Sequence, residues 1–116
     1  MLSIWRTKLK ILYEMASIST EKTGLDYKIW VSTKSGIKHS PRIKVSILKN
    51  DKIKYDQLFT VTIDDNPKII GSLSKKLSSK QLELIKKFVA INKTSLLQFW
   101  EEDITTDKLL DKLLKA

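Results

Sequence analysis

Apolar and polar residues alternate in the first half of the chain, and this alternation is the clearest structural signal in the sequence. In residues 25–33 and 41–49, every second side chain is apolar or Thr, apart from Lys49 at the end of the second segment. Side chains of a β-strand point to opposite faces in turn, so this pattern predicts two strands with one buried face. We expect the buried face to carry Tyr27, Ile29, Val31, Thr33, Ile43, Val45 and Ile47. We expect the opposite face to carry Lys28, Trp30, Ser32, Lys34, Arg42, Lys44 and Ser46.

Two further strands follow the same logic. One is centred on Phe59, Val61 and Ile63, and a short last strand covers 68–72. Asn50-Asp51 and Asp65-Asn66-Pro67 are turn signals between the strands. Because each connection is short, we predict that neighbours in the sequence pair in an antiparallel meander.

The hydrophobic period changes to a helical one in the last third of the chain. Ser78 and Gln81 have the spacing of a capping box, and the run that follows predicts a helix over 79–101 with a bend near 92–94. A last helix is expected over 107–115, capped by Thr105 or Thr106. Its apolar stripe consists of Leu109, Leu110, Leu113 and Leu114.

The order of these elements indicates the fold class. Strands that precede helices are typical of an α+β domain. We therefore predict an antiparallel four-stranded meander with C-terminal helices packed on one face. We expect a single α+β domain over 17–116, with 17–24 as a loop, and an N-terminal helix or upstream extension over 1–16, helical over 3–14.

Charge adds a functional clue. Residues 22–54 contain nine Lys or Arg and two Asp, a local charge of 9 − 2 = +7 in a chain of net charge +9. Residues 94–116 carry three Lys and five acids, so the positive charge is a patch. Clustered cations favour an anionic partner.

The sequence also bears on the location of the protein. The absence of Cys fits a reducing, cytoplasmic setting, and no apolar run approaches the roughly 20 residues of a membrane span.

The predicted solvent-facing side of the sheet is the candidate binding site. Lysine and arginine can neutralise phosphates, and an aromatic ring can stack on a base. The candidate set, in the strands and the loop between them, is Lys28, Trp30, Lys34, Lys38, Arg42 and Lys44. The alternative interpretation is that the charged residues only keep this face solvated, and that Trp30 is a core residue.

Two other functions stay open. His39 is the single histidine, and with Arg42 and Lys44 it could act on an RNA phosphate in a small ribonuclease-like toxin. The Leu stripe of the last helix could instead form a homodimer. One histidine without cysteine cannot build a typical zinc site, and Asp64-Asp65-Asn66 is typical of a turn, so we predict neither a metal nor another cofactor.

Three segments of the chain carry a resemblance to other proteins: Lys38-His-Ser-Pro-Arg-Ile-Lys-Val45, Ile69-Ile70-Gly71, and a stretch from Leu77 to Trp100 that contains Leu96-Leu97. With these segments the chain resembles a small uncharacterised bacterial family, a domain of unknown function. The resemblance covers 27–102. The family motif is rich in His around its proline, whereas this chain has Lys38, Arg42 and Lys44 there. The resemblance implies a setting in toxin–antitoxin or phage-defence neighbourhoods, with anion contact in place of metal binding.

Together, these patterns predict a non-enzymatic binding module. Its basic sheet face would contact nucleic acid or a protein with an acidic surface. The protein would be a component or inhibitor in a toxin–antitoxin, mobile-element or phage–host conflict system. No membrane association is expected.

Overall fold

A computed structural model describes residues 15–34, 40–49, 54 and 56–116 of the chain. Its centre is a five-stranded sheet in the order β1-β2-β3-β4-β5, in which every neighbouring pair is antiparallel. The strands are β1 (Met15–Ile18), β2 (Tyr27–Ser32), β3 (Arg42–Lys49), β4 (Leu58–Thr62) and β5 (Ile69–Ile70). The α+β class and the meander are therefore confirmed, but the sheet has five strands and not the expected four.

The additional strand is β1, which lies at the edge of the sheet beside β2. Its Ala16 pairs with Val31 and its Ile18 with Ile29, and both Ala16 and Ile18 are buried. The expected loop over 17–24 is wrong, because its first two residues belong to β1 and Thr20–Thr23 form a short helix, α2. The strand also includes Met15 and Ala16, which the predicted boundary assigned to the N-terminal segment. The expected helix over 3–14 lies outside the described residues.

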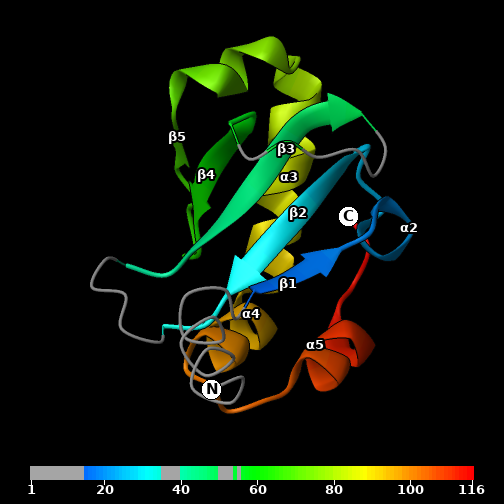
Figure 1. Ribbon diagram of the computed structural model, residues 1–116, viewed down its shortest axis with the longest axis vertical. Coiled ribbons are helices and arrows are strands. Elements are labelled where there is room, and N and C mark those ends of the chain that lie inside the picture. Colours follow the sequence, from blue (N-terminus) through cyan, green and yellow to red (C-terminus); the bar gives the residue numbers. More distant parts are fainter. Residues whose placement is uncertain (1–14, 35–39, 50–53, 55) are drawn as a thin grey trace, which may run out of the picture.

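Helices cover one face of the sheet, called here the inner face. The helix α3 (Ser79–Ile91) runs behind the sheet in Figure 1, with α4 (Lys93–Trp100) and α5 (Thr106–Lys112) near the end of the sheet where β2 finishes. A 3₁₀ helix, η1 (Ser72–Lys76), leads from β5 to α3. None of the helices in the described part of the chain is long and apolar enough to cross a membrane.

The core lies between α3 and the inner face. The inward residues of β2, and those of β3 as far as Val45, alternate with partly exposed ones as the sequence predicts, and Ile29, Ile43 and Val45 have no exposed surface. Ser46, which was expected on the solvent-facing side, is instead buried, because the pairing of β2 with β3 becomes irregular there. On the helix side, Ile85, Phe88 and Val89 of α3 are equally buried. Each such side chain stabilises the fold by roughly 1.5–3 kcal/mol through removal from water.

The long C-terminal helical run is broken at Asn92, where the bend was expected. Asn92 is buried and its side chain forms three hydrogen bonds. Its Nδ2 donates to the carbonyl oxygens of Phe88 and Leu114, both at 2.9 Å, and its Oδ1 accepts from the Leu114 amide at 2.8 Å. The amide therefore fixes the chain after α5 against the break between α3 and α4.

Capping residues set the beginnings of two helices. The Ser78 hydroxyl accepts from the Gln81 amide at 3.2 Å, which confirms half of the capping box. The Gln81 side chain instead donates to Asp26 at 2.9 Å, so the reciprocal bond is not formed. Thr105, one of the two expected caps, accepts from the amide of Lys108 at 3.4 Å.

The Leu stripe of α5 contributes mainly to the core. Leu109 is fully buried, and Leu110 and Leu113 pack against the core in part. Leu114 lies beyond the end of the helix and is 60% exposed. Dimerisation through this segment stays a prediction, with little of the stripe left outside the core.

Candidate functional site

The face of the sheet opposite the helices, called here the outer face, brings several predicted residues together. Strand pairing places Lys44 of β3 between Trp30 of β2 and Thr60 of β4. In the next row, Arg42 lies across from Thr62. Arg42 and Lys44 therefore occupy neighbouring positions on one face of the central strand, as their spacing of two residues requires.

Arg42 and Lys44 are partly exposed and are held by neutral partners. The Arg42 guanidinium donates to the Ser40 carbonyl oxygen at 3.2 Å and to its hydroxyl at 3.4 Å. The Lys44 ammonium donates to the Thr60 hydroxyl at 3.0 Å. Within the described part of the chain, no carboxylate forms an ion pair with either residue. Both side chains are thus positioned without a described carboxylate to compensate their positive charges.

Lys28 and Trp30 extend this face along β2. Both are half-buried, in alternation with the inward Tyr27, Ile29 and Val31. Strand alternation places Trp30 on the outer face, because its neighbours Ile29 and Val31 point inward. Because only part of its surface is exposed, the ring offers a partial platform for stacking.

Lys34 has a different environment from the rest of the predicted set. Its ammonium forms an ion pair with Glu101 at 2.9 Å, and its backbone amide donates to the Trp100 carbonyl oxygen at 2.9 Å. The hydrogen bond and charge of Glu101, with smaller effects of Glu102 and Asp103, raise the pKa of Lys34 above its ordinary value. The positive charge of Lys34 is therefore largely satisfied within the protein.

Two predicted residues, Lys38 and His39, lie outside the described residues. The turn expected at Asn50-Asp51 lies outside them as well. The ribonuclease alternative depends on His39, so it stays a prediction. Asp64 and Asp65 do form a turn between β4 and β5, where Asp64 accepts from the Thr62 hydroxyl at 2.8 Å and Asp65 pairs with Lys93 at 2.9 Å.

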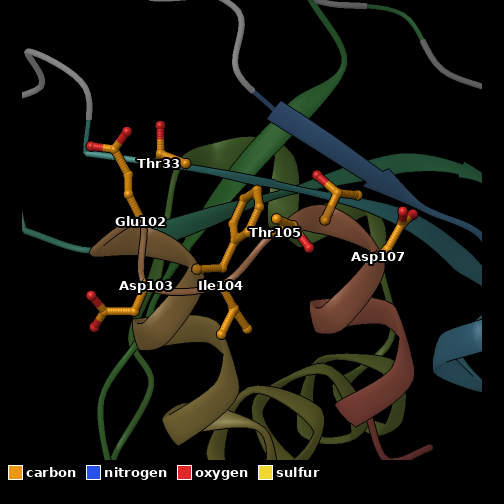
Figure 2. A pocket seen from close by; sticks show the side chains of 8 residues that line it. Thr33, Glu102, Asp103, Ile104, Thr105 and Asp107 are labelled. Atoms are coloured by element: carbon orange, nitrogen blue, oxygen red, sulfur yellow. The ribbon is translucent and has the colours of Figure 1, made fainter.

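An acidic hollow lies where the connection between α4 and α5 meets the end of β2. Its volume is about 450 Å³, and Figure 2 shows the carboxylates of Glu102 and Asp103 on one side and that of Asp107 on the other. The sequence showed the acidic run but not the hollow, because Thr33 and this connection are distant in the chain. Among the described residues, no group of three or more His, Cys, Asp or Glu could hold a metal ion.

A second hollow, of about 440 Å³, is basic and lies between the β4–β5 turn and α3. Lys68 lines one side of it, and Lys86 and Lys87 line the other. Sequence reasoning missed this site because Lys68 follows a turn while the other two residues sit within a helix. The signal that could have found it was a pair of adjacent lysines on a helix expected to cover the sheet.

Comparison of the chain with protein-family models, curated proteins and solved structures finds no match. The resemblance to an uncharacterised bacterial family therefore stays a prediction. Function has to be inferred from the geometry and charge of the outer face.

Proposed function

We propose that this protein is a non-enzymatic nucleic-acid-binding module whose outer sheet face contacts the phosphate backbone of a single strand. One observation carries the proposal: Arg42 and Lys44 lie side by side on the central strand, partly exposed and bonded only to neutral groups among the described residues. Cations held in this way can accept phosphate without first breaking an internal ion pair.

The remaining residues of this face fit the same role. Lys28 adds a third cation along β2, and the partly exposed Trp30 ring lies directly across from Lys44. Base stacking on an aromatic side chain contributes about 1–3 kcal/mol per base at fully used platforms. The half-buried Trp30 should contribute less, so we expect phosphate contacts to dominate affinity and sequence preference to be weak.

A single strand suits this face better than a duplex. The partly exposed ring can meet a base only where that base is unstacked, as in single-stranded nucleic acid. No described helix is presented as an isolated, basic element that would enter a major groove, because α3, α4 and α5 all bury residues in the core.

The test is the salt dependence of binding to a fluorescent single-stranded oligonucleotide. The affinity should fall steeply with salt, and the double variant Arg42→Ala/Lys44→Ala should bind more weakly. Its slope of log K against log salt should be shallower by about 1.4, because each phosphate that is no longer neutralised lowers the slope by roughly 0.7. A matched control, Lys108→Ala/Lys115→Ala, removes the same charge from exposed sites at the C-terminal end of the chain.

Three results would contradict the proposal. Binding that does not change with salt excludes a phosphate-based interface. Equal reductions in affinity for the two double variants would show that only net charge matters. Failure to bind RNA or DNA, together with salt-sensitive binding to polyglutamate, would identify an acidic protein as the partner class instead.

A further inference from the structure

The basic hollow between the β4–β5 turn and α3 has the composition of an anion site. Its polar lining consists of Asn66, Lys68, Glu83, Lys86 and Lys87. With three lysines and one acid, the lining has a net charge of 3 − 1 = +2. Its volume of about 440 Å³ lies within the ordinary range of ligand sites.

The single acid of this lining is already paired. Glu83 contacts Lys86 at 3.1 Å across one turn of α3, in an exposed pair. Nearby, Lys93 pairs with Asp65 of the turn. Lys68 and Lys87 have no ion pair with any carboxylate in the described part of the chain. Two exposed lysines therefore line the hollow without an ion pair to any described carboxylate.

Lys68 links this hollow to the outer face. Its amide donates to the Thr62 hydroxyl at 2.8 Å, and its carbonyl oxygen accepts from the Thr62 amide at 2.9 Å. Thr62 is in turn the strand partner of Arg42. Arg42, Thr62 and Lys68 thus form one row across the sheet, and two strand spacings separate the ends of this row by about 10 Å.

We propose that the lysine hollow, defined by Lys68, Lys86 and Lys87, is a second phosphate-binding site for the same nucleic-acid strand. The strand would leave the outer face at Arg42, cross the β5 edge at Lys68, and place a further phosphate between Lys68 and Lys87. This inference rests on the proposed function, because it extends the path of the same ligand around the edge of the sheet.

The chemistry of the lining favours phosphate. Lysine ammonium groups supply three donors each and can approach a phosphate oxygen from several directions, and the Asn66 amide can add a neutral donor. The Glu83–Lys86 pair is exposed, so Lys86 can turn to a phosphate at small cost. Binding at two linked sites also raises the affinity for long strands more than for short ones.

The test compares two oligonucleotide lengths, about four and about twelve nucleotides, within the range of site sizes known for single-strand binders. The double variant Lys68→Ala/Lys87→Ala should bind the longer oligonucleotide more weakly, with a salt slope shallower by about 1.4. Its affinity for the short oligonucleotide, which fills the outer face alone, should match that of the wild type. Lys108→Ala/Lys115→Ala is again the control, and thermal unfolding shows whether each variant is folded.

The outcomes separate this inference from the proposed function. If Arg42→Ala/Lys44→Ala weakens binding but Lys68→Ala/Lys87→Ala does not, the hollow is not a binding site, and the proposal that the outer face binds nucleic acid is retained. If only the hollow variant weakens binding, the outer-face proposal fails and the hollow is the interface. Equally weakened binding of both oligonucleotide lengths by the hollow variant would overturn the path around the β5 edge.

Discussion

The two faces of β3 differ in a way that separates stability from binding. On the inner face, Ile43 and Val45 have no exposed surface and pack against the layer of helices. On the outer face, Arg42 and Lys44 are partly exposed and bonded to neutral groups. One strand therefore supplies both a core and a charged surface, and neighbouring residues should respond very differently to substitution.

The largest effect is expected on the inner face. Ile43→Ala should lower the free energy of unfolding by about 2–5 kcal/mol, because it removes buried methyl groups and leaves a cavity. Ile43→Val, which keeps most of the volume, should cost about 0.5–1.5 kcal/mol. Urea unfolding followed by circular dichroism measures both. A destabilisation by Ile43→Ala no larger than that by Lys44→Ala would contradict the assignment of the two faces.

The next-largest effect is expected at Asn92, whose side chain bonds the C-terminal segment to the break between α3 and α4. Asn92→Ala should lower the free energy of unfolding by about 1–3 kcal/mol, since the partly buried amide and carbonyl groups of Leu114 lose their partners. Leu114→Ala is the matched control, because it keeps these backbone groups and changes only an exposed side chain. If the control destabilises the protein as much as Asn92→Ala does, the backbone hydrogen bonds are not what stabilises the C-terminal segment.

A smaller effect on stability is expected on the outer face. Arg42→Ala and Lys44→Ala should each change the free energy of unfolding by no more than about 0.5 kcal/mol, as is usual for surface substitutions. The double variant should therefore remain folded while its oligonucleotide affinity falls. Differential scanning calorimetry and the binding assay, applied to one preparation, measure the two properties together. Unfolding of the double variant at room temperature would show that these residues are structural.

The smallest effect concerns Lys34, whose charge is compensated. Its folded-state pKa is raised above the ordinary value of 10.5, so the ion pair with Glu101 contributes stability below that pH, and this stability disappears as the pH rises through the folded pKa. The wild type should unfold at a slightly higher temperature than Lys34→Gln at pH 8, and this difference should vanish well above pH 10.5. A difference that grows with pH would have the wrong sign for this ion pair.

The sequence predicted the central strands well because each is long enough to show alternation. Along β2 and the first half of β3, one side chain in two is buried, and the pattern of Ile, Val and Tyr against Lys and Arg reflects this. In contrast, β1 has four residues, of which only Ala16 and Ile18 mark the inner face. Two residues are too few to show a period, so this edge strand was missed.

Contacts between distant parts of the chain explain the other differences. Alternation predicted that Lys34 lies on the solvent-facing side, but its ion pair with Glu101 joins residues 67 positions apart. The lysine hollow likewise combines a turn and a helix. Strand alternation predicts which face a residue occupies, whereas these contacts depend on how the helices lie against the sheet.

The most direct test of the outer-face interface is a nitrogen–proton correlation NMR titration with an unlabelled single-stranded oligonucleotide. We predict that the largest shift changes will occur at amides of β2, β3 and β4 next to Trp30, Lys44 and Thr62. The chemical shifts of the α5 amides (Thr106–Lys112) should change little. The largest changes in α5, with the sheet amides unmoved at saturation, would contradict binding at the outer face.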